Sequence, residues 1–412
     1  MTWLELPLLY ATVGVASVVL ALLSRRLRSL PVTEPLVGLL LGVVLGQGGV
    51  LGGSGALGWD ETQRDTLLLE SSRLLLAASV MAAALRFPTR RLRALVRPVA
   101  WMLLVVMPAA AVISGGLALT LGLPLALAAV VGACLSPTDP VLAASVVTGD
   151  VAERSLPSRL RALLTAESGA NDGLALPLVA IAVSLALTAR DTGHELLILT
   201  WEVLGAVVIG VVAGLVTAAG RRLATREHDL AGGPSLVLTL LLALAALGVA
   251  RLAGTDGVLA VFVAGIAYGA RTDESTREHQ DMIDEAVNRY AVVPFFLLVG
   301  AALPWADWAA LGPVVVLVTV GVLVVRRLPT VLLMAPVLGL TRRDAAFAGW
   351  FGPMGVSAVF YLAHARDQGV TDPRVFALGM LVVAASTVVH GTTAAPLVRL
   401  YARSDADRPA RS

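Results

Sequence analysis

The sequence contains no lysine, so every basic side chain among its 412 residues is an arginine. This absence excludes mechanisms that need a lysine with a movable pKa, because the arginine guanidinium stays protonated at accessible pH. Cys134 is the single cysteine, and no intrachain disulfide can therefore form. The formal net charge of +2 is too small to indicate a nucleic-acid partner.

Charged residues are also scarce, at 15% of the chain, whereas 57% of the residues are hydrophobic and the mean hydropathy is +0.83. A hydrocarbon core of about 30 Å requires about 20 apolar residues per helix, and apolar segments of that length recur from residue 5 to residue 402. The composition predicts an all-α polytopic membrane protein. We expect a single membrane domain over residues 1–402 and a short cytoplasmic tail, 403–412.

Hydropathy and turn residues together predict thirteen membrane spans. The eleventh is long enough to kink, and Pro329 offers a place for the bend. The predicted spans are 5–24, 32–50, 63–85, 98–121, 123–148, 159–187, 198–219, 232–252, 255–270, 284–302, 309–338, 344–364 and 375–402.

The arginines give the predicted orientation, because cytoplasmic loops carry an excess of basic residues. Groups of arginines follow the odd-numbered spans, whereas the loops after even-numbered spans hold only scattered ones. The pattern predicts an N-terminus outside the cell and a C-terminus in the cytoplasm. The groups are Arg25, Arg26 and Arg28; Arg86, Arg90, Arg91, Arg93 and Arg97; Arg154, Arg159 and Arg161; Arg221, Arg222 and Arg226; Arg271 and Arg277; and Arg342 and Arg343.

Two aspartates, Asp139 and Asp172, lie inside segments otherwise rich in Ala, Val and Leu. An ionisable group at this depth is costly, and it commonly faces a hydrated cavity on an ion or proton path. The two residues make the chain a candidate transporter.

Asp139 lies in a Ser-Pro-Thr-Asp-Pro motif, residues 136–140, within the fifth span. Pro137 and Pro140 free backbone carbonyls, and these oxygens with Thr138 and Asp139 would suit a hard monovalent cation. Alternatively, Asp139 only caps the second half of a broken helix. The twelfth span carries a second candidate break at residues 351–355, in a helix that runs in the opposite direction. Paired broken helices of this kind are typical of inverted-repeat transporters.

The sixth span places Asn171 beside Asp172, with Ser168 one turn earlier on the same face as Asp172. Burial favours the neutral form of a carboxylate and a bound cation favours the charged form. A proton and a cation would therefore compete for Asp172. The alternative is an aspartate that hydrogen-bonds to a neighbouring helix for packing.

Glu167 lies about 500° of helical rotation before Asp172 and points elsewhere. It requires a cationic partner, and Arg327 or Arg326 in the middle of the eleventh span is the best candidate. We interpret this pair as a structural clamp between helices. Glu70 can pair with Arg73 three residues later in the third span, and a role for Glu70 near the cation is a further hypothesis.

These motifs, with Gly-Pro-Met-Gly-Val-Ser-Ala-Val at 352–359 and His-Gly-Thr-Thr-Ala-Ala-Pro at 390–396, resemble the monovalent cation:proton antiporter family, in its Na+/H+ exchanger branch. The resemblance implies a homodimer with inverted repeats and with spans five and twelve unwound and crossing. It also implies a dimerisation part near 1–85 and 198–302. The core part, near 98–187 and 309–402, would move against it.

By motif position, the resemblance makes Asp172 the ion-binding aspartate and Asn171 its partner. Asp139 and Thr138 match the residues of the unwound helix. Ser168 and Glu70 match positions that contact the ion directly or through water, while Glu167 and Arg327 match a buried ion pair. The Asn-Asp form implies electroneutral exchange. Met354 is a departure, because the family usually has an arginine there.

The predicted function is exchange of a monovalent cation, most simply Na+, for H+ across the cytoplasmic membrane, in the service of pH homeostasis. Asp172 and Asp139 would hold the transported cation, and no cofactor or enzymatic activity is expected. The alternatives are a K+/H+ antiporter and a transport-impaired scaffold of the same fold. A membrane hydrolase with two aspartates is excluded, because its Tyr-Asp and Gly-x-Gly-Asp pair is missing from the sequence.

Overall fold

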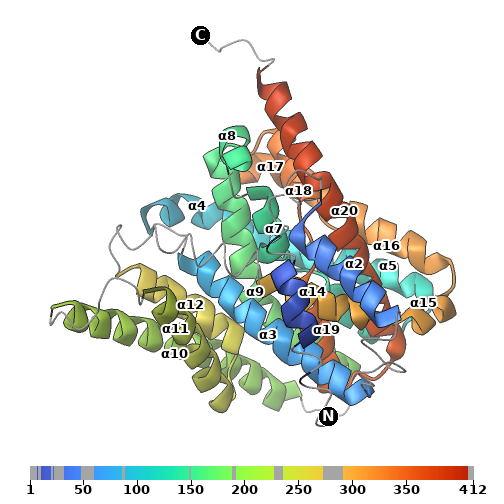
Figure 1. The fold of residues 1–412 in the computed structure, drawn as a ribbon, viewed down its shortest axis with the longest axis horizontal. Coiled ribbons are helices and arrows are strands. Elements are labelled where there is room, and N and C mark those ends of the chain that lie inside the picture. The colour runs from blue at the N-terminus through green and yellow to red at the C-terminus, as the bar shows by residue number, and fades with distance from the viewer. Residues whose placement is uncertain are drawn as a thin grey trace.

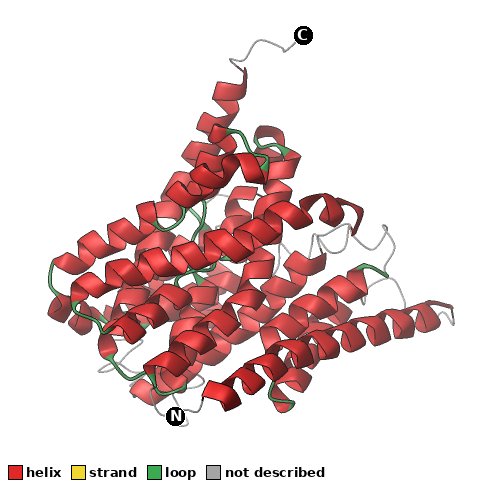
Figure 2. Ribbon diagram, turned by 180° about the vertical axis from the view of Figure 1, so that it is seen from behind, coloured by secondary structure: helices red, strands yellow, loops and turns green. Residues whose placement is uncertain are grey.

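A computed structural model describes residues 7, 11–19, 22, 32–47, 60–85, 89–147, 150–187, 192–226, 235–271 and 291–406. Within these ranges the chain consists of helices and connecting loops, with no strand (Figure 2). Part of the predicted span 5–24 and the start of the span 284–302 lie outside the described residues. The same is true of Arg25, Arg26, Arg28, Arg86, Arg277 and most of the predicted tail.

The helices follow the apolar segments of the sequence. In chain order they are α2 (Glu34–Gln47), α3 (Glu61–Leu85), α4 (Thr89–Trp101), η1 (Met102–Val106), α5 (Met107–Ala118), η2 (Leu119–Leu121), α6 (Leu125–Cys134), α7 (Pro140–Val147), α8 (Asp150–Ser155), α9 (Ser158–Ala186), α10 (Thr192–Arg226), α11 (Ser235–Leu252), α12 (Gly257–Gly269), α14 (Val292–Ala301), α15 (Trp305–Leu311), α16 (Val314–Val325), α17 (Leu328–Leu338), α18 (Arg342–Trp350), α19 (Val356–Asp367) and α20 (Pro373–Ala406).

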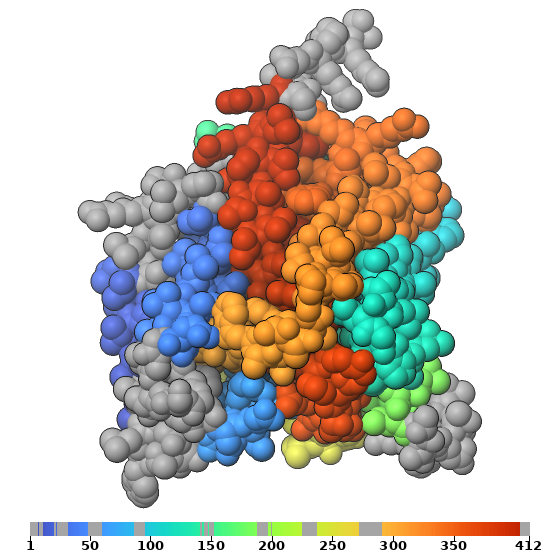
Figure 3. All heavy atoms as spheres, turned by 90° about the vertical axis from the view of Figure 1, so that its right-hand side faces the viewer, coloured from blue at the N-terminus to red at the C-terminus, as the bar shows by residue number. Residues whose placement is uncertain are grey.

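The helices gather into two regions. Helices α10, α11 and α12 pack on one another at one side of the molecule, with α3 against them (Figure 1). On the opposite side, α15 and α16 pack along the long α20, and α5 lies beside α16 (Figure 3). The largest apolar core lies between these regions and is built mainly from α3, α6, α9, α14, α19 and α20. Helices α9 and α19, which carry the candidate site, are therefore central.

In the described part of the chain, six helical segments are long and apolar enough to cross a membrane, and a seventh results if α14 and α15, bent by 58°, form one span. The six match the predicted spans three, four, six, seven, eleven and thirteen. The other predicted spans correspond to shorter apolar helices or to broken ones wherever the structure describes them. The molecule is a multi-pass membrane protein, and the total of thirteen spans stays a prediction.

Several predicted boundaries were wrong. The arginines after span three were assigned to a loop, but Arg90, Arg91, Arg93 and Arg97 lie on α4, which begins nine residues before the predicted span. Span eleven does not begin at residue 309, because α15 occupies 305–311 and α16 starts at Val314. The short helices α8 and α15 were not predicted, since hydropathy does not distinguish one or two turns from a loop.

The eleventh span is interrupted, as its length and Pro329 indicated. Helix α16 ends at Val325 and α17 begins at Leu328, so Pro329 occupies the first turn of the new helix. At that position the N–H that proline lacks would have no helical partner. Arg326 and Arg327, which the sequence analysis placed in the middle of the eleventh span, therefore lie in a helix break.

Glycines allow α2 and α14 to pack with their backbones in contact. Gly38, Gly42 and Gly46 repeat every four residues on α2, and a Cβ at Gly42 would lie 2.1 Å from the carbonyl oxygen of Leu297. On the facing helix, a Cβ at Gly300 would lie 2.2 Å from the carbonyl oxygen of Leu39. Small residues with this spacing are what close packing of membrane helices requires.

We expect Gly42→Ala to destabilise the protein by about 1–3 kcal/mol, because the methyl group would displace the backbone of α14. Gly116→Ala is the matched control, since its Cβ would have no atom within 4 Å. The control should stay within about 1 kcal/mol of the parent. Thermal unfolding of the two variants in detergent tests this, and equal midpoints would contradict the packing argument.

Candidate ion-binding site

Two broken helices meet in the centre of the molecule. The first break separates α6 from α7 at residues 135–139, and the second separates α18 from α19 at residues 351–355. The Asp139 N–H donates to the Pro353 carbonyl oxygen at 2.9 Å and so joins the two breaks. The helices are thus interrupted at both predicted positions, while their assignment as unwound, crossing helices stays a prediction.

Arg326 binds both breaks at once. Its guanidinium is buried and donates to the carbonyl oxygens of Leu135 and Gly352. It also donates to the carbonyls of Ser136 and Pro137, at 3.2 and 3.1 Å. The sequence had suggested that carbonyls freed in this segment would face a cation. In this conformation these carbonyls instead serve the arginine, which satisfies backbone groups that lipid would leave unpaired.

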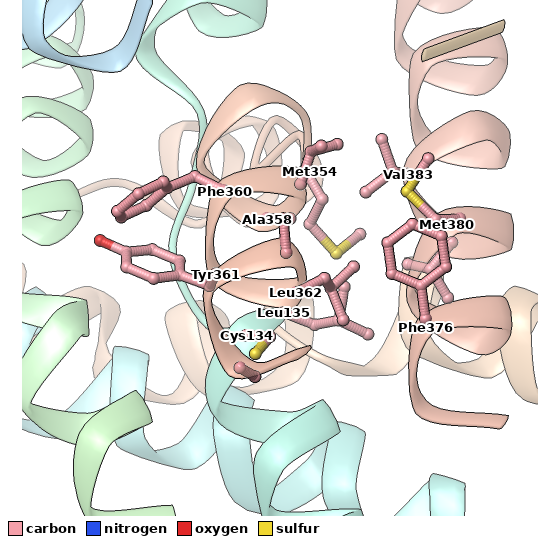
Figure 4. Close-up of a cluster of buried hydrophobic side chains, with 14 of the residues drawn as sticks. Cys134, Leu135, Met354, Ala358, Phe360, Tyr361, Leu362, Phe376, Met380 and Val383 are labelled. Atoms are coloured by element: carbon pink, nitrogen blue, oxygen red, sulfur yellow. The ribbon is translucent and has the colours of Figure 1, made fainter. Parts of the chain in front are cut away.

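Met354 lies in the second break and is fully packed. Its side chain points toward Met380 and Val383 of α20 (Figure 4), and its N–H donates to the Ser386 hydroxyl at 2.8 Å. The resemblance to the antiporter family implied that a methionine here removes a buried positive charge. Arg326, at the α16–α17 junction, donates to the Gly352 carbonyl in the same break. A buried positive charge is therefore present at this break despite the methionine.

Glu167 forms an ion pair with Arg327, and the role of this pair as a clamp between helices stays a prediction. The two groups make a bidentate pair, with nitrogen to oxygen distances of 2.8 and 3.0 Å, and both side chains are buried. Asn171 Nδ2 donates to Glu167 at 2.8 Å, and Thr138 Oγ1 donates to both of its carboxylate oxygens at 3.2 and 3.1 Å. The lone pairs of Glu167 are therefore occupied, which fits a structural role.

The Asp172 carboxylate, unlike that of Glu167, accepts no hydrogen bond from the described residues. The residue is completely buried, yet neither carboxylate oxygen has a hydrogen-bond partner among the described residues. Asp139 and Glu167 are near enough for their charges to act on it. A buried carboxylate left in this way is strongly disfavoured unless it takes up a proton or a cation.

Asn171 connects the Glu167–Arg327 pair to Thr138 in the first break. Its Nδ2 also donates to Thr138 Oγ1 at 2.7 Å, whereas its Oδ1 is buried without a hydrogen-bond partner in the described part of the chain. The amide is thus oriented by Glu167 and Thr138, with an acceptor oxygen left over beside Asp172. The Asn-Asp pair offers three such oxygens for a small cation.

Asp139 caps α7, which is the alternative role that the sequence analysis considered for it. Its Oδ1 accepts the Leu142 N–H at 3.1 Å, and its carbonyl accepts the Ala143 N–H at 3.0 Å. A Cβ at Gly355 would lie 2.5 Å from the Asp139 Oδ2, so only glycine fits this position of the second break. The cap does not conflict with ion binding, and the ion-binding role of Asp139 stays a prediction.

Ser168 and Glu70, the other two predicted ion-binding residues, have other hydrogen-bond or ion-pair partners in the structure. Ser168 is buried on α9, and its hydroxyl donates to the Thr165 carbonyl at 3.3 Å. Glu70 is partly exposed and pairs with Arg73, as predicted, and with Arg251 of α11 at 3.4 Å. Glu70 therefore belongs to a cluster with the two arginines, and its part in ion binding stays a hypothesis.

Two residues near Asp172 were missed by the sequence interpretation. The Tyr361 hydroxyl donates to the Asp172 carbonyl oxygen, and the Ser357 hydroxyl faces the Asp172 carboxylate without a hydrogen bond in the structure. Both lie on α19, one turn apart on one face. A polar residue followed four positions later by tyrosine, just after a glycine-rich break, was the available signal.

The fold and the site together define a multi-pass helical membrane protein whose broken helices surround a buried carboxylate. Residues 13–400 match the family described as "Sodium/hydrogen exchanger, transmembrane". The chain belongs to this sodium/hydrogen exchanger family.

Curated relatives carry the corresponding names. The chain is 31% identical over 379 residues to Na(+)/H(+) antiporter 2 of Zygosaccharomyces rouxii, covering 87% of this chain and 46% of that protein. It is 29% identical over 374 residues to the Na(+)/H(+) antiporter of Saccharomyces cerevisiae, covering 87% and 38%. The chain therefore spans less than half the length of these two relatives.

Among solved structures, two of the sodium proton antiporter MjNhaP1 from Methanocaldococcus jannaschii have the same fold. One, at pH 8, has a TM-score of 0.74 and covers 96% of this chain and 99% of that chain. The other has a TM-score of 0.78 and covers 99% and 100%. Sequence identity is 18% in both cases, so this similarity concerns the fold.

Proposed function

We propose that this chain exchanges a monovalent cation, most simply Na+, for H+ across the cytoplasmic membrane. The observation that carries the proposal is the buried Asp172 carboxylate, whose oxygens have no hydrogen-bond partner among the described residues. Membership of the sodium/hydrogen exchanger family and the names of the relatives support the same conclusion. Asp172 would hold the proton and the cation in turn.

The buried charges around the breaks support exchange of one cation for one proton. Three carboxylates, those of Asp139, Glu167 and Asp172, lie with two guanidinium groups, Arg326 and Arg327, in the described core. The cluster is short of one positive charge, which either one Na+ or one H+ would supply. Because a net charge is costly in this environment, the two ions would replace each other without changing the total charge.

Alternating access would come from movement of one part of the protein against another. We place the moving core near residues 98–187 and 309–402, and the dimerisation part near 1–85 and 198–302. The separate packing of α10, α11 and α12 beside the central helices supports this division. The functional unit would be a homodimer, with the N-terminus outside and the C-terminus in the cytoplasm.

The proposal is tested with purified protein in vesicles that carry an imposed pH gradient. We expect Na+ added outside to release protons, and we expect the rate to stay the same when valinomycin and K+ clamp the voltage. A rate that follows the voltage would contradict one-for-one exchange. Comparing Na+, Li+ and K+ identifies the cation, and a larger response to K+ would favour a K+/H+ exchanger. No proton movement with any of the three would identify a transport-impaired scaffold.

A further inference from the structure

A polar cavity lies outside the cluster around Asp172. It has a volume of about 340 Å³ and is lined by residues of α3, α9, α10, α11, α19 and the segment where α12 begins. Its wall includes apolar residues of α9 and charged residues of the other elements. Those relevant here are Leu176, Ala180, Glu202, Asp256, Phe360 and His364.

Among the described residues in and beside this cavity, acidic groups outnumber arginines. Glu202, Asp256 and Asp367 line it together with Arg73 and Arg251. Both arginines are bound to Glu70, which adds a fourth carboxylate for two guanidinium groups. Arg73 also lies over the Phe360 ring, with its guanidinium carbon 5.6 Å from the ring centroid. The balance of charge favours a cation over an anion in the cavity.

Asp256 is the residue in this wall that points to a ligand. It is 3% exposed, and its Oδ1 accepts the N–H groups of Val258 and Leu259 at 2.8 and 3.0 Å, which caps α12. Its Oδ2 is buried with no hydrogen-bond partner among the described residues. An asparagine or serine would cap the helix as well. The cap therefore leaves the negative charge and the second oxygen unexplained.

The cavity follows the same helix faces as the Asp172 site. Leu176 and Ala180 come four and eight residues after Asp172, so α9 turns toward the cavity the face that carries the carboxylate. On α19, Phe360 and His364 follow Ser357 along one face in the same way. The cavity and the Asp172 site thus lie on one seam between α9 and α19.

A contact between α9 and α12 separates the cavity from the Asp172 site. A Cβ at Gly173 would lie 3.3 Å from Leu259 Cδ1, so α12 packs closely on α9 beside Asp172. Leu259 comes one turn after Asp256, whose side chain binds its N–H. A cation at Asp256 would therefore be separated from Asp172 by this apolar contact.

We propose that this cavity is a second, lower-affinity cation site on the approach to Asp172, with Asp256 as the main ligand and Glu202 adding negative charge. The inference rests on the proposed exchange function, since it concerns the path of the exchanged cation. In the predicted orientation, the cavity lies at the outer ends of α9 and α19. The site would raise the local concentration of monovalent cations on that face of the membrane.

The first test measures exchange from each face separately, in vesicles with uniformly oriented protein. Asp256→Asn keeps a capping oxygen and removes the charge. We expect it to raise the half-saturating Na+ concentration about 3- to 10-fold at the face where α12 begins, with a maximal rate within about twofold of the parent. The opposite face should be unchanged. Asp307→Asn, an exposed acid at the start of α15 outside this cavity, is the matched control and should have no effect.

The second test needs no transport. In a Cys134→Ala background, Ala180→Cys places the only thiol in the cavity wall. We expect a cationic methanethiosulfonate reagent to modify it at least about 10-fold faster than an anionic one, and Asp256→Asn to reduce this ratio several-fold. A ratio near one, or a ratio that Asp256→Asn leaves unchanged, would overturn the proposed site.

The two tests separate the two ideas. If the thiol shows the preference for the cationic reagent but the parent protein exchanges no ions, the proposed function fails and the cation-attracting cavity stands. If exchange is normal but Asp256→Asn changes neither the half-saturating concentration nor the reagent ratio, the cavity proposal fails alone. A lower maximal rate with no shift in concentration would mean that Asp256 only stabilises α12.

Discussion

Replacing Asp172 with asparagine should abolish cation-driven proton movement in vesicles. The amide has the shape of the carboxylate, but it can neither release a proton at accessible pH nor neutralise a cation. A unit charge at 4 Å from a cation contributes about 4 kcal/mol at an effective dielectric constant of 20. Its loss would reduce cation affinity on the order of 1000-fold. We therefore expect exchange by Asp172→Asn to fall to the level of empty vesicles.

The control for this variant must show that the protein still folds. The Asp172 carboxylate oxygens accept no hydrogen bond from the described residues, so asparagine removes no native hydrogen bond of the side chain. Because a buried charge is costly, the variant should unfold at the same temperature as the parent or at a higher one. Retained exchange in a well-folded Asp172→Asn protein would mean that Asp172 is not the exchange site.

Much of this site could be predicted from the sequence because costly residues in apolar segments need a reason. Asp139, Glu167 and Asp172 each lie in a run of small apolar residues, and prolines marked where the helix had to break. The pairing of Glu167 with an arginine of the eleventh span followed from the same argument. These are local signals, and the structure contains the broken helices and the ion pair that they indicated.

The assignment of the two adjacent arginines could not be made in this way. On a continuous helix, Arg326 and Arg327 point about 100° apart, and either could face Glu167. The break between α16 and α17 changes both directions, so Arg327 reaches Glu167 while Arg326 reaches the carbonyls of residues 135–137. Which arginine binds Glu167 is therefore determined by the way α9, the α6–α7 break and the α16–α17 break pack together. The contact of Tyr361 with Asp172 was hidden for the same reason, since it joins residues 189 positions apart.

The division of labour between the two arginines leads to a second large effect, on stability. Arg327→Met would leave Glu167 buried beside Asp139 and Asp172 without its bidentate partner. Removing one member of a buried ion pair costs about 3–5 kcal/mol, because the remaining charge is uncompensated. We expect the thermal midpoint of Arg327→Met in detergent to fall well below that of the parent.

A double-mutant cycle distinguishes a clamp from simple loss of packing. Glu167→Gln combined with Arg327→Met removes both charges, and we expect the double variant to be more stable than Arg327→Met alone by about 2 kcal/mol or more. The matched control is the exposed pair Arg161–Glu153, whose atoms are 3.3 Å apart, where Glu153→Gln should change stability by less than about 0.5 kcal/mol. Additive effects at Glu167 and Arg327 would contradict the clamp. The Glu167–Arg327 pair holds α9 against the α16–α17 break, and Glu167 also holds the Asn171 amide in place. A double variant that folds stably but exchanges no ions would therefore mean that the pair also orients Asn171 for transport.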